Sequence, residues 1–435
     1  MWRREASCSI GRLKRVARMT VPSDREPEQD EVRVSRRNAG EPTRARRRPT
    51  RPLKIASGPL PVVDDRDREA ATDARLFLEE GHSLFDRGKT EEAIASWERA
   101  IEIAPDLAEA WNRIGTAREA DGRHHDAARS LRRSLSIAGE QHEAWFNLGN
   151  VEDARGDFRA AVAAFQRAVE IRPEMGEAWN NLGNAWVHVG GLDEAVRAYL
   201  RALEARPDLY ESWFNLGNAW ADLGELDRAV EAHRRAVEIR PTVFEVWYNL
   251  GFALSTRGDP EAAADAYRRA SALAPDDYEV WYNLGNACLD AGWHDEAVAA
   301  YRCSLEGCRE DHEVWNNLGN ALAQLGRRPE AIVSYKQALQ LNPSYDVSWS
   351  NLGNVLDERG DLDAAARAYG RAVTLAPAVA TYHFNRASVL AKQGHKETAI
   401  EHLAMAIERA PDIAGLLSSY PEFTALLTDP RLSRE

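Results

Sequence analysis

Apolar residues recur at helical spacing along most of this chain, and the pattern restarts every 34 residues, ten times between Ala74 and Ile413. Counting Ala74 as position 1, positions 3, 4, 7, 8, 10 and 11 of each repeat form the apolar face of one helix. A second helix carries Ala at position 20, an aromatic residue or Leu at position 24 in most repeats, and Ala or Ser at position 27. The pattern predicts a helical hairpin repeated in tandem over residues 74–413.

Small residues and proline occupy fixed places in the repeat. Position 15 is Gly in every copy, just past the first helix, where left-handed backbone costs Gly little. Position 32 is Pro in eight copies and is expected to end the second helix. Small residues at positions 8, 20 and 27 let the two helices approach, and we expect Trp at position 4 and the residue at position 24 to fill the space around them. One hairpin cannot bury its apolar face alone, so stability should come from stacking.

These residues resemble the tetratricopeptide signature, in which W-x2-L-G-x2-Y is followed by A-x3-F and then by P. The first motif reads WFNLGN at 145–150, WNNLGN at 179–184 and WYNLGN at 281–286. The resemblance implies an all-α, right-handed superhelical solenoid of ten 34-residue helix-turn-helix units. Glu80 and Arg386 depart from the usual Leu in the first and last repeats, as expected where an outer face meets water.

The two ends of the chain fall outside the repeat. Residues 1–70 are rich in Arg, Pro, Asp and Glu, which predicts a disordered basic tail. Its densest basic run, residues 44–51, is either a solvated linker or an arm for docking or for nucleic acid. Composition changes after Met19, so translation starts at Met1 or Met19. Residues 414–435 carry apolar residues at helical spacing and are predicted to form a C-terminal capping helix over the last repeat.

Charge and composition restrict the classes of partner. The net charge is −13 although the tail is basic, so the repeat array itself is strongly acidic and should repel nucleic-acid phosphates. The chain contains neither an apolar run long enough for a membrane span nor a secretory signal. Three of its four cysteines fall in one repeat, which is no disulfide framework. We predict a cytoplasmic protein that binds neither membranes nor, through its repeats, nucleic acid.

No catalytic motif is recognisable in the sequence. There is no Gly-rich phosphate loop, no H-E-x-x-H and no G-x-S-x-G. Cys303, Cys308 and His312 lie close in sequence, but their spacing matches no usual zinc pattern. Because repeats and flanks account for the whole chain, we expect a protein that is not an enzyme and that holds no cofactor or metal.

The resemblance implies a concave groove lined by the first helices, with positions 2, 5, 6, 9, 12 and 13 facing into it. Position 6 is Asn in eight consecutive repeats and position 9 is Asn in six. Because Asn both donates and accepts hydrogen bonds, a ladder of Asn either binds the backbone of an extended peptide or holds neighbouring hairpins together. Position 5 is often aromatic, which is typical of contact residues. The predicted ligand-binding residues are Asn147, Asn181, Asn215, Asn249, Asn283, Asn317, Asn351, Phe146, Phe214, Tyr248 and Tyr282.

Acidic residues recur on the same face, with Glu at position 2 of seven consecutive repeats and further acids at positions 12 and 13. We therefore predict a scaffold or adaptor that binds extended protein segments, basic or neutral, in the groove. The array also resembles the Asn-lined solenoid of protein O-linked N-acetylglucosamine transferases. An alternative is thus a substrate-recognition component of a protein glycosyltransferase, without a catalytic domain of its own. A further alternative is a structural protein that self-associates through its end repeats.

Overall fold

The computed structural model describes residues 65–432, with side chains from residue 72 onward. Throughout this range the chain is all-α and contains no strand. It divides into two compact parts, residues 65–215 (the first part) and residues 216–432 (the second part). The boundary falls within helix α10 (Tyr210–Asp222). Residues 1–64 of the predicted tail, including both candidate start codons, and residues 433–435 lie outside the described residues.

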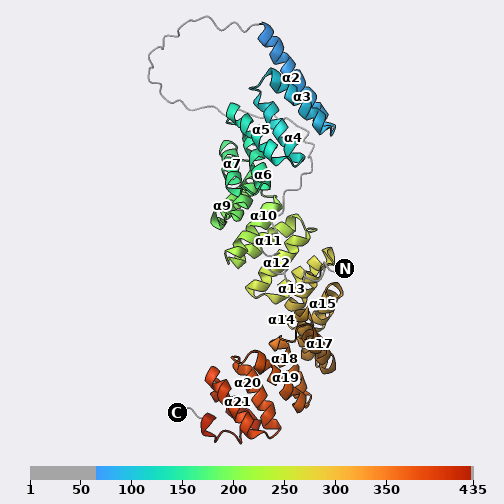
Figure 1. The fold of residues 1–435 in the computed structure, drawn as a ribbon, viewed down its shortest axis with the longest axis vertical. Coiled ribbons are helices and arrows are strands. Elements are labelled where there is room, and N and C mark those ends of the chain that lie inside the picture. The colour runs from blue at the N-terminus through green and yellow to red at the C-terminus, as the bar shows by residue number, and fades with distance from the viewer. Residues whose placement is uncertain (1–64, 433–435) are drawn as a thin grey trace, which may run out of the picture. The chain divides into compact units, whose positions relative to one another are not determined.

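Helices of the first part stack in consecutive pairs, in the order of the sequence (Figure 1). They are α2 (Asp65–Asp86), α3 (Thr90–Ile103), α4 (Ala108–Ala120), α5 (His124–Ile137), α6 (His142–Ala154), α7 (Phe158–Ile171), α8 (Gly176–His188) and α9 (Leu192–Ala205). The first helix of each pair also packs against the second helix of the preceding pair, as α4 does against α3. Stacked hairpins of this kind form an all-α solenoid.

The second part repeats this arrangement from α11 onward (Figure 1). Its helices are α11 (Leu226–Ile239), α12 (Phe244–Arg257), α13 (Pro260–Leu273), α14 (Tyr278–Asp290), α15 (His294–Gly307), α16 (His312–Gln324), α17 (Arg328–Leu341), α18 (Asp346–Glu358), α19 (Leu362–Leu375), α20 (Ala380–Lys392) and α21 (Lys396–Arg409). As in the first part, α14 packs against both α13 and α15.

Helix α2 begins at Asp65, so it overlaps the last residues of the predicted tail and starts nine residues before the repeat pattern at Ala74. The stretch contains Arg, Glu and Ala, which favour helix. Extending an existing helix gains one hydrogen bond for each residue that is ordered, whereas starting a helix is costly. The first helix therefore continues outward beyond the repeat pattern.

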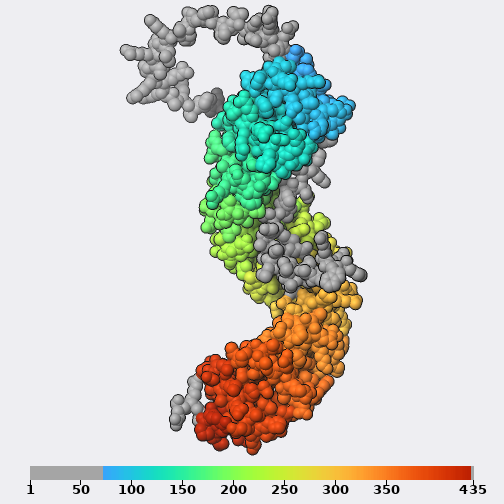
Figure 2. Space-filling view, viewed as in Figure 1, coloured from blue at the N-terminus to red at the C-terminus, as the bar shows by residue number. Residues whose placement is uncertain are grey.

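The predicted C-terminal capping helix is instead a series of short turns: α22 (Ile413–Leu416) and the 3-10 turns η1 (Leu417–Ser419), η2 (Pro421–Phe423) and η3 (Pro430–Leu432). Proline lacks the N–H group that a continuous helix needs, so η2 and η3 each start at a proline as a separate turn. The segment nevertheless covers the last hairpin, because Phe423 and Leu426 are buried against Leu403. Figure 2 shows the last hairpins and this cover as one continuous surface (orange to red).

The two helices of most hairpins meet where glycine at position 8 faces a ring at position 24. A Cβ atom added to Gly149 would lie 2.5 Å from the ring of Phe165, and one added to Gly183 would lie 2.4 Å from the ring of Tyr199. Real side chains essentially never approach so closely, and both rings are buried. At these positions only glycine leaves room for the facing ring.

Glycine at position 15 is required for a different reason. Its φ lies between 72° and 87° in every copy, and an added Cβ would meet nothing within 4 Å. The left-handed conformation predicted from the sequence is confirmed, and it ends each first helix. Two glycines of one repeat therefore serve two constraints, one steric and one conformational.

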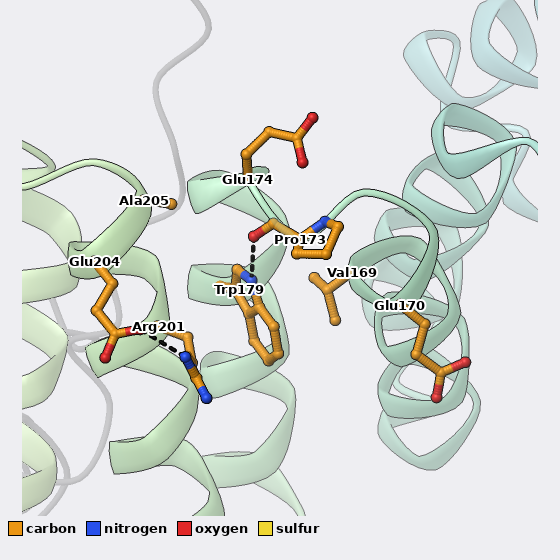
Figure 3. Close-up of a pocket in the computed structure, with 8 residues that line it drawn as sticks. All are labelled: Val169, Glu170, Pro173, Glu174, Trp179, Arg201, Glu204 and Ala205. Carbon is orange, nitrogen blue, oxygen red and sulfur yellow. Dashed lines mark hydrogen bonds and ion pairs between the residues drawn. The ribbon is translucent and has the colours of Figure 1, made fainter. Parts of the chain in front are cut away.

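Tryptophan at position 4 fills the hairpin core only in part, since Trp145, Trp179 and Trp349 pack against it without being fully buried. In all eight copies the indole is half-buried, and its N–H donates to the carbonyl of position 32 in the preceding loop at 2.7–3.1 Å. Figure 3 shows this bond from Trp179 to Pro173. Because the acceptor belongs to the backbone, Gly139 and Arg309 serve as well as proline, and α5 and α15 end in register with the other second helices.

A first prediction concerns the contact at position 8. Gly183→Ala should destabilise the protein by about 1–3 kcal/mol, because the methyl group must displace the buried ring of Tyr199 and this outweighs the helix preference of Ala. Thermal unfolding followed by circular dichroism measures the effect. The last repeat carries Ala387 and Leu403 at the same two positions. In a Tyr199→Ala background, which removes the ring altogether, the cost of Gly183→Ala should shrink, and an undiminished cost would contradict the steric explanation.

A second prediction concerns His233, which takes the position-24 ring in α11 and is fully buried. Burial lowers its pKa from 6.5 to about 3. Below pH 6.5 the unfolded chain binds a proton that the folded chain does not, so stability falls as the pH drops. At pH 5 the loss is about 2 kcal/mol.

His233→Tyr should remove this loss, since Tyr fills the same position in five other repeats. The measurement is the difference in free energy of unfolding between pH 7 and pH 5. Exposed His125, changed to Tyr, is the control and should leave the difference as in the wild type. An unchanged difference in His233→Tyr would show that other groups dominate.

Candidate functional site

First helices of successive hairpins touch one another in both parts, as α4 touches α6 and α16 touches α18. Positions 2, 6, 9, 12 and 13 of a first helix are three or four residues apart from one another in succession, so they share one face. We call this face the acceptor stripe. It carries most of the residues that the sequence analysis selected.

Asparagines at positions 6 and 9 join neighbouring hairpins. The amide nitrogen of Asn181 on α8 donates to Asn150 Oδ1 on α6 at 3.0 Å, and Asn351 on α18 donates to Asn320 Oδ1 on α16 at 3.0 Å. The same bond recurs from Asn215, Asn249, Asn317 and Asn385 to position 9 of the preceding repeat. Asn147 donates to Thr116, which takes that place in its repeat. The amide donors are therefore used by the fold itself.

Tyrosine at position 24 extends this network into the hairpin core. The hydroxyl of Tyr335, on a buried ring, donates to Asn320 Oδ1 at 2.8 Å, so one amide oxygen serves both Tyr335 and Asn351. Tyr199, Tyr301 and Tyr369 donate to position 9 in the same way. Burial raises the pKa of each of these hydroxyls, so they remain protonated donors at neutral pH.

Several amide oxygens at position 6 remain available, whereas that of Asn215 is buried. Within residues 72–432 no donor reaches Oδ1 of Asn147, Asn249, Asn283 or Asn351, and these side chains are only partly buried. Asn181 and Asn317 each accept one bond, from the adjacent Asn180 and Asn316. Of the two roles weighed for the ladder, holding hairpins together uses its nitrogens, and its oxygens are left facing outward as acceptors.

Aromatic side chains at position 5 pack against the ring at position 24 of their own hairpin. Phe146 lies 5.9 Å from Phe165 between ring centroids, and Tyr282 lies 6.2 Å from Tyr301. Phe214 has no exposed surface, so the prediction that it contacts a ligand is wrong. Tyr248 is also buried, and its hydroxyl accepts from Asn283 at 3.1 Å. The reason is geometric, because position 5 sits one residue away from the stripe and faces the second helix.

Six carboxylates on the stripe have no partner in the described part of the fold. Across the described residues, no hydrogen bond or ion pair reaches Asp86, Glu143, Asp153, Asp222, Glu245 or Asp290. Burial raises the pKa of Asp153, an effect that nearby His188 only partly offsets, and burial likewise raises the pKa of Asp222. Other stripe acids do have partners. Glu177 pairs with Arg206, Asp357 with Lys392 and Glu358 with Arg328. Glu109 lies 3.9 Å from His82, and Glu279 accepts from the Tyr278 hydroxyl.

A surface pocket of about 550 Å³ lies at the edge of the first part, between α7, α8 and α9 (Figure 3). Trp179 and Val169 provide its apolar surface. Its three carboxylates are already paired: Glu170 with Arg167 at 2.5 Å, Glu174 with Arg172 at 3.1 Å and Glu204 with Arg201 at 2.7 Å. The pocket is therefore electrically balanced, unlike the acceptor stripe.

Two other kinds of site were considered on the described chain. No group of three or more His, Cys, Asp or Glu in residues 72–432 is placed to hold a metal ion. Cys288 is fully buried, and burial raises its pKa to about 12, so it is an unreactive core residue. Among the described helices, none is long and apolar enough to cross a membrane.

The role of the network can be tested at Asn320. Replacing Asn320 by Ala leaves the buried hydroxyl of Tyr335 and the amide of Asn351 without their acceptor, which should cost about 1–3 kcal/mol. Thermal unfolding measures this loss. Gln324, one turn further along α16 and exposed, is the matched control, and Gln324→Ala should change little. Equal stability of the two variants would mean that the network does not hold the hairpins together.

Comparison with known proteins gives several partial matches. A TPR repeat model matches residues 81–122, and two tetratricopeptide repeat models match residues 106–174 and 350–412. The model of the cilia and flagella-associated protein 70 C-terminal domain matches residues 177–347. No curated protein matches the sequence.

Solved structures with similar folds include YrrB, described as a TPR protein with an unusual peptide-binding site. It is 23% identical, with a TM-score of 0.41 over 43% of this chain and 97% of its own. MamA is 30% identical, with a TM-score of 0.38 over 39% and 93%. Cut9, from the APC/C hetero-tetramer Cut9–Hcn1, is 16% identical, with a TM-score of 0.38 over 78% and 74%. The hairpin geometry and the matching repeat models together show that this chain belongs to the tetratricopeptide repeat family.

Proposed function

We propose that this protein is a non-catalytic scaffold that holds extended segments of other proteins on the acceptor stripe of its first helices. The observation that carries the proposal is a chemical imbalance. The stripe presents amide oxygens such as those of Asn249 and Asn283 and carboxylates such as those of Asp222 and Asp290, while one N–H group of each of these two amides already donates within the fold. A ligand that complements such a surface must supply donors.

An extended polypeptide supplies donors at regular spacing. Every residue other than proline carries one N–H group, and in an extended segment these groups are not consumed by internal hydrogen bonds. Position 6 carries Asn in eight consecutive repeats, so one segment can meet several amide acceptors in turn. Lys and Arg side chains are donors only and carry the charge that the carboxylates attract.

The outer helices offer a weaker surface for the same ligand. On α9 Arg197 pairs with Glu194 at 2.8 Å, and on α11 Arg235 pairs with Glu238 at 2.9 Å. Because these charges already compensate one another, a basic segment gains little there. This contrast supports the stripe as the binding face and supports basic or neutral segments as its ligands. Glycosyltransferase association and assembly through the end repeats stay predictions.

Site-specific photo-crosslinking tests the proposal. Benzoylphenylalanine replaces Thr256, an exposed stripe residue of α12, or Arg269, an exposed residue of the second helix α13. The full chain is irradiated in a lysate of the source cells, and cross-linked proteins are identified by mass spectrometry. We expect proteins to be captured at Thr256 and not at Arg269, and an excess of a basic extended peptide should compete. Capture mainly at Arg269 would place binding on the outer helices and would contradict the proposal.

A further inference from the structure

Position 9 of the acceptor stripe carries one aromatic residue within the second part. Position 9 of α12 is Phe252, whereas α14, α16 and α18 carry Asn at this position. The side chain of Phe252 is 37% exposed, although neighbouring apolar residues of the same helix such as Leu250 and Leu254 are buried. An aromatic ring therefore faces solvent in the middle of a polar stripe.

Phe252 at position 9 changes the hydrogen bonds between neighbouring hairpins. Asn317 donates both to Asn286 and, at 3.4 Å, to Tyr282, whereas the equivalent Asn283 donates to Tyr248. Phe252 offers no side-chain acceptor, so it does not take part in the hydrogen bonds that link hairpins. The core of this hairpin is completed without it, by the ring pair of Tyr248 and Tyr267 at 5.8 Å. Phe252 therefore has neither of the structural roles that Asn has at position 9, because it neither links hairpins by hydrogen bonds nor completes the core.

Uncompensated carboxylates surround Phe252 on the stripe. Asn249 of α12 donates to Asn218 of α10, and Asn283 of α14 donates to Tyr248, so α12 lies between α10 and α14. Asp222 and Asp290 occupy position 13 on these two flanking helices, one turn beyond position 9. Glu245 lies two turns before Phe252 on the same helix. None of the three acids has a partner within the described chain, and burial raises the pKa of Asp222.

We propose that Phe252 sets the specificity of the groove by contacting an apolar side chain of an extended partner segment that carries Lys or Arg about three residues to either side. The spacing follows from geometry, because neighbouring helices pack about 8–10 Å apart. An extended segment in the polyproline II conformation has three residues per turn and advances about 3.1 Å per residue, so every third side chain points the same way about 9 Å further along. An apolar anchor on Phe252 therefore places its third neighbours over α10 and α14, where Asp222 and Asp290 lie. This inference rests on the proposed function and specifies its partner.

Synthetic peptides provide a defined probe. The peptide GSKGSFGSKGS has a central Phe with Lys three residues to either side, and its counterparts carry Ser in place of Phe or Glu in place of both Lys. Affinity for the full chain is measured by fluorescence anisotropy. We expect the Phe peptide to bind about tenfold more tightly than the Ser peptide, because only the Phe peptide buries an apolar side chain on Phe252. The Glu peptide should bind more weakly than both.

Three variants locate the effect. Phe252→Asn restores the residue of the neighbouring repeats, so it should fold, and it should bind the Phe and Ser peptides equally. Phe252→Leu should keep part of the preference. The double variant Asp222→Asn, Asp290→Asn should reduce the difference in affinity between the Lys peptide and the Glu peptide. Val333, which is 57% exposed on the second helix α17, is the matched control, and Val333→Asn should behave as the wild type.

Two results would overturn the inference. The first is an unchanged preference for the Phe peptide in Phe252→Asn with wild-type helical content. The second is loss of self-association in Phe252→Asn, seen by light scattering, with peptide binding unaltered, because a second copy would then be the occupant. If cross-linking at Thr256 persists with the same partners in Phe252→Asn, only this inference fails. If no protein is captured at Thr256, the proposed function fails as well.

Discussion

The contact between glycine at position 8 and the ring at position 24 is the constraint on which the rest of each hairpin depends. At Gly183 the ring of Tyr199 lies where a Cβ atom would be, so the two helices are as close as side chains permit. This closeness carries the Tyr199 hydroxyl across to the first helix, where it meets Asn184. Asn184 in turn accepts from Asn215 of the next first helix. A steric fit inside one hairpin thereby becomes a polar link between hairpins.

The polar link also decides what the first helices show to a partner. Since the amide nitrogens of position 6 are turned toward the preceding hairpin, as Asn351 is toward Asn320, oxygens such as that of Asn351 receive no donor from the described part of the chain. Carboxylates such as Asp290 add to them without compensating cations. The face is therefore rich in acceptors for a structural reason, and its preference for donor-rich segments is a by-product of how neighbouring hairpins are joined.

The loops between hairpins and the exposed faces of the first helices depend on different residues in this fold. The tryptophan bond to position 32 uses only a backbone carbonyl, so Arg309 and Gly139 are accepted in place of proline. Because each hairpin contacts chiefly its neighbours, a local change on one first helix, such as Phe252, leaves the others intact. A solenoid can thus acquire a specific contact in one repeat without redesigning the array.

The sequence by itself determined what depends on near neighbours along the chain. The hairpin repeat, the helix ends and the left-handed glycine at position 15 follow from residues a few places apart, and the structure agrees with them. The acceptor-rich face was only half predictable, because Asn at position 6 can bind a ligand or a neighbouring hairpin with the same atoms.

Only the tertiary structure decided which groups the Asn side chains at position 6 bind. The partners of Asn351 lie 31 and 35 residues away, and only stacking brings them within bonding distance. Stacking likewise buried Phe214 and left Phe252 exposed. It also left the tryptophans half-buried, with their N–H groups bound to backbone carbonyls. The physical reason is that exposure and hydrogen-bond partners are properties of the assembled neighbours, whereas helix formation is a property of the local chain.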